Sequence, residues 1–345
     1  MVFRIFPMLL CVAALAAADT VRVRAGEGAV FRNESGDAFL SLGGRMQLRH
    51  TYQQVEGAPD VNNFQTSRIR LALKGGTPAW DWEFQSDFAN RNNVTLKDAF
   101  VSRRVTPDVS LRFGQFKAGY DRQQLESSGR QTFVDRNIAS AALGKGRDLG
   151  VMLGGRAASR RLQYNVGVFN GGGEGQANGG TGNMAVGRIS LNPFGDFGLS
   201  QGDLKRSAEP RAFVDAAGYF SQDEAWSGEG EFGAALGAGF RMAGVYLAGE
   251  YLLRETSAGA RSSGFHAQAS YMLLPERLEI AARYAQVDPD ADAGGDLRTE
   301  SMGGVNVYFD RRGHNLKLNT DLALLKDEAT GQEDLRTRAQ FQIAF

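Results

Sequence analysis

The chain has 345 residues, and it contains 44 glycines, 8 prolines and a single cysteine. Glycine at roughly twice its usual share disfavours a protein built from long helices and suits a large sheet. Basic and acidic residues balance at 39 each, so the charge of the chain predicts no nucleic-acid partner.

The first 18 residues have the pattern of a secretory signal peptide. A cationic start that ends at Arg4 precedes an apolar run of about 13 residues, and Ala16 to Ala18 form a small-residue cleavage site. The alternative is a transmembrane anchor, which needs about 20 apolar residues. Cleavage would remove Cys11, the only thiol, so an exported chain without disulfides has to be stabilised by backbone pairing or by a large core.

After a short N-terminal extension, residues 19–38, hydrophobic residues recur at every second position. In the first such segment, Leu40, Leu42 and Leu48 alternate with Ser41, Arg45 and Gln47. This period of two predicts strands with one apolar and one polar face. Sixteen segments follow the pattern, near residues 39–52, 64–75, 80–89, 94–104, 109–117, 147–156, 161–170, 183–192, 211–221, 231–241, 244–254, 263–273, 278–287, 299–309, 314–324 and 335–345.

The connections between these segments alternate in length. They are mostly short after even-numbered strands and longer and polar after odd-numbered ones, with residues 193–210 as a long exception. An even number of strands of about ten residues, with both termini on the short-turn side, is typical of a transmembrane antiparallel β-barrel, whose sheet must close in lipid. The alternative is a soluble β-sandwich, whose strands are usually shorter. Residues 39–345 therefore predict an all-β barrel of about sixteen strands with a water-filled lumen.

The fifth connection, residues 118–146, is too long for a bare loop. We expect it to fold into the barrel as a constriction loop. Its charged residues are mixed, with four basic side chains and three acidic ones: Asp121, Arg122, Glu126, Arg130, Asp135, Arg136 and Lys145.

Several motifs resemble the phosphate-selective porin O and P family of Gram-negative outer membranes. They are "FQTSRIRLALKG", "WDWEFQSDF", "TLKDAFV", "LRFGQFKAGYDRQQLESS", "RDLGVMLGG" and "YNVGVFNGGG", and they lie between Phe64 and Gly173. The resemblance implies a homotrimeric sixteen-stranded barrel that passes anions, with phosphate or pyrophosphate selected by some members. The arginine ladder and lysine cluster of well-known members have no residue-by-residue match here.

Candidate anion contacts come from the polar face of the strands and from the constriction loop. If the second and third strands pair across Gly76 to Ala79, Lys74 faces Asp81, Arg68 faces Asp87 and Arg70 faces Gln85, which leaves Arg70 without a carboxylate. Arg70 is then the leading candidate for contact with an anion. The pore-lining candidates are Arg45, Arg49, Arg68, Arg70, Lys74, Arg122, Arg130 and Arg136. The alternative is that these are solvated lumen side chains that only bias conductance.

The chain ends in "QFQIAF", which places Phe341, Ile343 and Phe345 on one face and Gln340 and Gln342 on the other. We expect the apolar face to contact outer-membrane lipid and the backbone to pair with the first strand, which closes the barrel. A terminal aromatic with apolar residues two and four places before it also resembles the signal read by the barrel-assembly machinery.

No motif predicts a catalytic set, a metal site or a cofactor. The acidic run Asp288 to Asp296 lacks the closing Glu of a calcium loop, and the three histidines have no ligand spacing. The sequence predicts a passive outer-membrane porin for small hydrophilic anions such as phosphate. The alternatives are a general, weakly selective diffusion porin, and, from other classes, a barrel enzyme such as a lipase or a surface receptor or adhesin.

Overall fold

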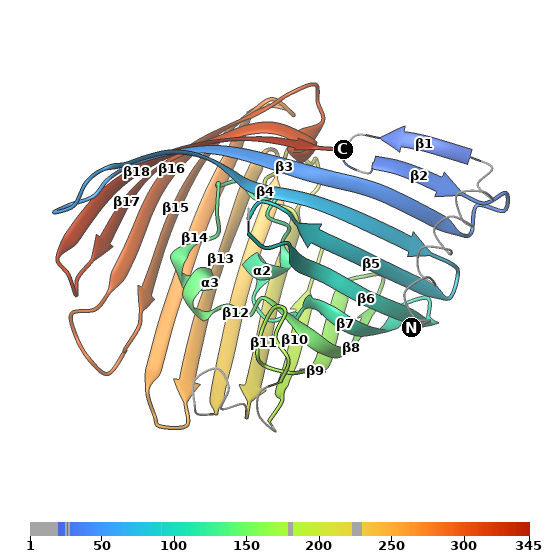
Figure 1. Cartoon of the computed structure of the whole chain (residues 1–345), viewed down its shortest axis with the longest axis horizontal. Coiled ribbons are helices and arrows are strands. Elements are labelled where there is room, and N and C mark those ends of the chain that lie inside the picture. The colour runs from blue at the N-terminus through green and yellow to red at the C-terminus, as the bar shows by residue number, and fades with distance from the viewer. Residues whose placement is uncertain (1–19, 25, 27, 91, 179–181, 223–229) are drawn as a thin grey trace.

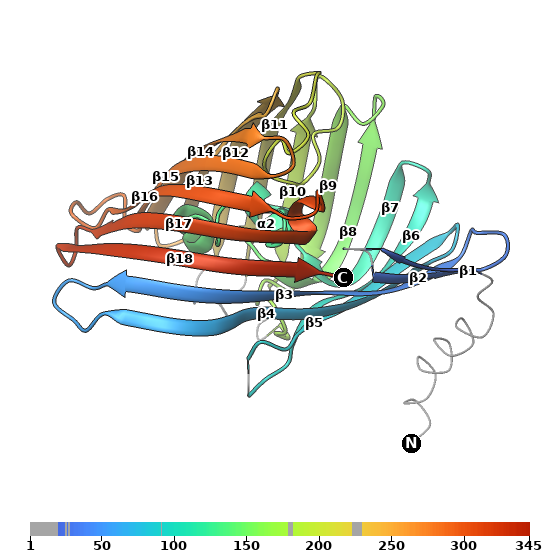
Figure 2. The same cartoon turned by 90° about the horizontal axis from the view of Figure 1, so that it is seen from above.

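The computed structural model describes residues 20–345 except 25, 27, 91, 179–181 and 223–229. The predicted signal peptide lies outside the described residues. Sixteen antiparallel strands, β3 to β18, each pair with the next, and β18 pairs with β3, so the sheet closes into a barrel (Figures 1 and 2). The sixteen-stranded fold expected from the alternation is confirmed, and each strand end lies within about three residues of its expected place.

The strands are β1 (Thr20–Arg24), β2 (Gly28–Arg32), β3 (Phe39–Gln54), β4 (Val61–Gly76), β5 (Trp80–Asp87), β6 (Thr95–Thr106), β7 (Val109–Lys117), β8 (Arg147–Ala157), β9 (Leu162–Phe169), β10 (Met184–Leu191), β11 (Arg211–Ser221), β12 (Glu231–Met242), β13 (Val245–Thr256), β14 (Arg261–Leu274), β15 (Leu278–Asp288), β16 (Arg298–Tyr308), β17 (Leu316–Asp327) and β18 (Gln332–Ala344). The helical turns are α2 (Arg122–Leu125), α3 (Ile138–Leu143) and the 3-10 turn η1 (Gly313–Asn315).

The alternation along each strand separates an outer from an inner surface. On β18, Phe341 is 40% exposed on the outer face, whereas its neighbours Gln340 and Gln342 are buried inside. Leu236 on β12 and Val168 on β9 are exposed in the same way as Phe341. Apolar side chains thus cover the outside, where lipid solvates them, and polar ones cover the inside. None of the helices in the described part of the chain is long and apolar enough to span a membrane.

The barrel seam lies between the last strand and the first. Phe341 is opposite Leu48, and Gln340 is opposite Arg49. The final residue is held as well, because Phe345 exchanges two backbone hydrogen bonds with Gly44, at N···O distances of 3.0 and 2.7 Å. Backbone pairing therefore explains why this terminus does not fray.

Residues of the N-terminal extension form a hairpin, β1–β2, to which the sequence reasoning assigned no strands. β2 pairs with Phe39–Leu42, the part of β3 that lies beyond the end of β18. The backbone N–H of Gly26 also donates to the carbonyl of Ala344, at 3.2 Å. The hairpin thus prolongs the seam at the short-turn end, beside the C-terminus (Figure 1).

Candidate anion-conducting constriction

The constriction loop, residues 118–146, lies inside the barrel and carries α2 and α3 (Figure 1). Its two ends are joined by the buried side chain of Asp121. This carboxylate caps α2 by accepting from the backbone N–H of Gln124, at 3.1 Å, and it also accepts from the Ser140 hydroxyl and the Lys145 N–H. Burial raises the pKa of Asp121, and its hydrogen bonds oppose that rise. Asp121 therefore determines the shape of the loop.

Apolar contacts fasten one side of the loop to the barrel wall. Ala139 and Leu143 of α3 and Tyr120 pack against inward-facing Tyr219 and Leu252. The Tyr120 and Tyr219 rings meet edge to face, with centroids 4.9 Å apart. The wall strands β11 to β15 thus bury the loop, and free lumen remains along the opposite strands, β3 to β8.

Arg122 points into that wall and not into the lumen. Its guanidinium pairs with Asp215 at 3.0 Å and with Glu126 at 3.3 Å, and it lies 3.6 Å from the ring centroid of Phe213. The pairing with two buried carboxylates leaves Arg122 out of reach of a passing ion. It fastens the loop to the wall.

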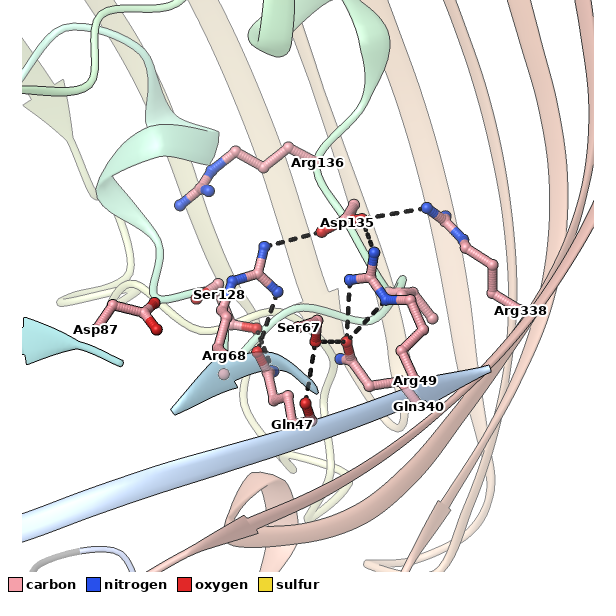
Figure 3. Close-up of polar contacts among 12 residues, drawn as sticks. Gln47, Arg49, Ser67, Arg68, Asp87, Ser128, Asp135, Arg136, Arg338 and Gln340 are labelled. Carbon is pink, nitrogen blue, oxygen red and sulfur yellow. Dashed lines mark hydrogen bonds and ion pairs between the residues drawn. The ribbon is translucent and has the colours of Figure 1, made fainter. Parts of the chain in front are cut away.

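Asp135 joins the loop to the seam of the barrel. It accepts from Arg49 at 2.7 Å, Arg68 at 2.9 Å and Arg338 at 3.2 Å, which project from β3, β4 and β18 (Figure 3). Burial alone would raise the pKa of Asp135, but the three guanidinium groups outweigh burial and lower that pKa. Arg338 was not among the predicted pore-lining residues, although its alternation with Phe341 places it on the inner face.

The expected pairing between β4 and β5 is wrong by two residues. Arg70 is opposite Asp87 and binds it at 2.8 Å, and Lys74 is opposite Glu83 and binds it at 3.1 Å. The cause is the turn, which spans residues 77–79 and leaves Gly76 paired with Asp81. A shift of two residues keeps every side chain on its face while changing its partner. The prediction that Arg70 lacks a carboxylate is therefore wrong.

Other cations at the constriction have no carboxylate within ion-pair distance in the described part of the chain. Arg45 donates to the hydroxyls of Ser127 and Ser128, at 3.1 and 2.9 Å. Arg136 donates to the carbonyl of Gln123 at 2.7 Å, and burial lowers its pKa to about 10, which leaves it charged at neutral pH. Lys117 donates to the carbonyl of Leu125 at 2.7 Å. Neutral acceptors satisfy their hydrogen bonds without cancelling their charge.

Among the described residues, two cavities lie beside the constriction loop. The outer cavity, toward the long loops, has a volume of about 420 Å³ and is lined by Arg49 and Arg68. The inner cavity, toward the short turns, has a volume of about 760 Å³ and is lined by Arg45 and Arg70. On β3 and on β4, therefore, one arginine lines each cavity, and Asp135 lines the outer one. The basic side chains that line the inner cavity are Arg32, Arg45, Arg70, Lys74, Arg112, Lys117, Arg130, Arg136 and Arg147, and the acidic ones are Glu83 and Asp98.

This imbalance leaves a net positive charge in the inner cavity. Carboxylates neutralise three of the nine basic side chains, since Arg70, Lys74 and Arg147 bind Asp87, Glu83 and Asp98. The other six have no carboxylate within 4.0 Å among the described residues, and Arg130 is exposed. Uncompensated cations therefore gather directly below the constriction.

The long connection of residues 193–210 also folds inward, from the short-turn end. The Gln201 side chain accepts from the Thr132 N–H at 2.8 Å, and its backbone N–H donates to the Arg130 carbonyl at 3.0 Å. Phe197 is fully buried against Phe213 and Tyr246. The exceptional length of this connection is thus used to support the constriction loop from below.

The profile of the family described as phosphate-selective porin O and P matches residues 40–345, which is nearly the whole barrel. The chain belongs to the phosphate-selective porin O and P family. Membership and fold place this porin in the bacterial outer membrane, as a channel protein. A comparison with curated proteins found no match.

Solved porins share the fold at low sequence identity. An anion-selective porin from Comamonas acidovorans is 16% identical, with a TM-score of 0.64, and the alignment covers 89% of this chain and 100% of that one. The outer membrane channel DcaP of Acinetobacter baumannii is 14% identical, with a TM-score of 0.65 and coverage of 91% and 99%. The trimer form of OmpT from Vibrio cholerae is 9% identical, with a TM-score of 0.58 and coverage of 88% and 99%.

Proposed function

We propose that this porin carries small hydrophilic anions, including phosphate, by passive diffusion, and that the constriction sets its preference for anions. The observation that carries the proposal is the inner cavity, where nine basic side chains face two acidic ones. A cleft lined by one sign of charge and bounded by low-dielectric walls concentrates ions of the opposite sign.

Arg45, Lys117 and Arg136 are the side chains that we propose touch the passing ion. Each is held in position by neutral oxygen atoms and has no carboxylate beside it that would neutralise a positive charge. A guanidinium offers a planar set of donors that suits oxyanions such as phosphate. Arg130 adds positive charge to the lining of the inner cavity. Arg49, Arg68 and Arg70 contribute less positive charge, because each of them forms an ion pair with a carboxylate.

Two findings from the comparisons support this function. The family takes its name from phosphate selectivity, and the Comamonas porin of the same fold is anion-selective. A general diffusion porin is the second candidate, and ion selectivity separates the two. The geometry of the site supports a channel and gives no reason to propose an enzyme, a receptor or an adhesin.

We further propose that the porin is a homotrimer embedded in outer-membrane lipid and inserted by the barrel-assembly machinery. The trimer form of OmpT, which has the same fold, supports the homotrimer. The terminal pattern of Phe341, Ile343 and Phe345 supports insertion by the barrel-assembly machinery, since Phe341 and Phe345 are both exposed on the barrel.

The test is the reversal potential in planar bilayers across a potassium chloride gradient. Replacing Arg45 and Arg136 together by Gln should move the wild-type potential from chloride preference toward zero. The Arg45→Lys variant keeps the charge and should keep most of the preference. Lys326→Gln is the matched control, because Lys326 lies near the end of β17 and already pairs with Glu333. An unchanged potential in the double variant would refute the assignment.

A further inference from the structure

The inner cavity contains apolar side chains as well as cations. Phe100 of β6, Met152 of β8, Leu125 of the constriction loop and Leu199 of the inward segment 193–210 all line it. Leu199 is 40% exposed, and Phe100 and Met152 are partly exposed. The interior of a water-filled barrel is ordinarily polar. These four side chains, which come from two strands and two inward segments and are called the apolar patch below, therefore give the inner cavity an apolar component.

The apolar patch lies next to cations that have no carboxylate partner. The Arg112 guanidinium carbon is 4.2 Å from the ring centroid of Phe100 and 5.3 Å from that of Phe116. Lys117 follows Phe116 in the chain and is bonded through Nζ to the carbonyl of Leu125. A solute in the inner cavity can thus touch apolar surface and a positive charge together.

We propose that the inner cavity binds small aromatic carboxylates, such as benzoate, during passage. The ring would pack on Phe100 and Met152, and the carboxylate would meet Arg112 or Lys117. A volume of about 760 Å³ is in the range of small-molecule sites, which combine apolar walls with a few charged groups. A halide or phosphate ion would use the cations alone. This inference rests on the proposed anion channel and names an additional class of solute for it.

The test compares the block of chloride current by benzoate and by acetate, two monocarboxylates that differ in apolar surface. In single-channel records of the wild type, benzoate should halve the chloride current at a concentration roughly tenfold lower than acetate does, because its ring buries apolar area that acetate lacks. Equal concentrations for the two anions would overturn the proposal.

Two variants show whether the apolar patch is responsible. Met152→Gln and Phe100→Asn should each bring the benzoate and acetate concentrations to within about twofold, while the chloride reversal potential stays at its wild-type value. Full discrimination in both variants would overturn the proposal. Phe100 also packs against Phe116, so if Phe100→Asn fails to insert, Met152→Gln decides. The reversal potential tests the anion channel separately, so failure of this inference is distinguishable from failure of the proposed function.

Discussion

Replacing Asp135 by Asn should increase the preference for anions. The carboxylate lies within 3.2 Å of nitrogen atoms of Arg49, Arg68 and Arg338. Replacing it by a neutral amide therefore makes the net charge around these three guanidinium groups more positive by one unit. Asn keeps the shape and can still accept hydrogen bonds. The loop backbone keeps its other contacts, since Val134 N–H donates to Asp321 and Asn319 donates to the Thr132 carbonyl. Charge should therefore change while the width of the pore stays nearly constant.

The size of the effect follows from Coulomb's law. One unit charge about 5 Å from an ion in water contributes about 0.8 kcal/mol. Salt at about 0.1 M, with a Debye length of about 10 Å, reduces this to about 0.5 kcal/mol. The chloride ion gains and the potassium ion loses that amount, so the ratio of their permeabilities should rise roughly fivefold.

The reversal potential in a potassium chloride gradient measures this ratio. The control is Asp60→Asn, which removes an exposed carboxylate outside the constriction, where it accepts from Tyr52, and which should shift the potential much less. A reversal potential of Asp135→Asn that equals that of the wild type, or that moves toward the potassium sign, would show that Asp135 does not reduce the preference for anions.

Acid should not reproduce the effect of Asp135→Asn. Burial raises the pKa of Asp135, but Arg68, Arg49 and Arg338 lower it further than burial raises it. A carboxyl group with a lowered pKa keeps its charge in the folded state until the pH falls through that lowered value. Between about pH 8 and pH 5 the wild type should therefore not move to the potential of the variant. A shift of the wild-type reversal potential to that of the variant would show that the three arginines do not keep Asp135 ionised in this pH range.

Four further variants test the loop and the seam. Asp121→Ala leaves two backbone N–H groups and the Ser140 hydroxyl without their acceptor, at a cost of about 1–3 kcal/mol each. Single-channel records of this variant should therefore show frequent closures. Ser140→Ala removes only one of the three hydrogen bonds, so its records should show fewer closures. Closures no more frequent than in the wild type would contradict this role of Asp121. Arg122→Ala should lower the temperature at which the barrel unfolds, measured by gel mobility, because it leaves buried Glu126 and Asp215 without this cation, at a cost of roughly 3 kcal/mol. An unchanged unfolding temperature would contradict this role of Arg122. Deletion of Phe345 should reduce the amount of inserted barrel without altering single-channel conductance, and normal insertion would count against a role in assembly.

The alternation of apolar and polar residues was sufficient to predict the barrel because lipid and water impose opposite requirements on the two faces of every strand. The same rule could not fix the partner of Arg70, since registers that differ by two residues place the same side chains inside. The β1–β2 hairpin escaped prediction because two five-residue strands carry too little pattern to be distinguished from a loop.

The interior of the barrel was less predictable than its wall. The length of residues 118–146 and the charges within it indicated a constriction, but their partners depend on contacts between residues far apart in the chain. Arg122 binds Asp215 in the wall, and Asp135 binds Arg338 at the seam. Whether a loop charge faces the pore or the wall follows from the path of the loop, which local sequence patterns do not specify.

We propose that uncompensated positive charge below the constriction makes the pore anion-preferring. The reversal potential of the wild-type porin across a potassium chloride gradient tests it most directly. The wild type should give a reversal potential of the sign set by chloride, and this potential should move toward zero when Arg45 and Arg136 are both replaced by Gln. A wild-type potential near zero, or one of the sign set by potassium, would show that this charge does not select anions.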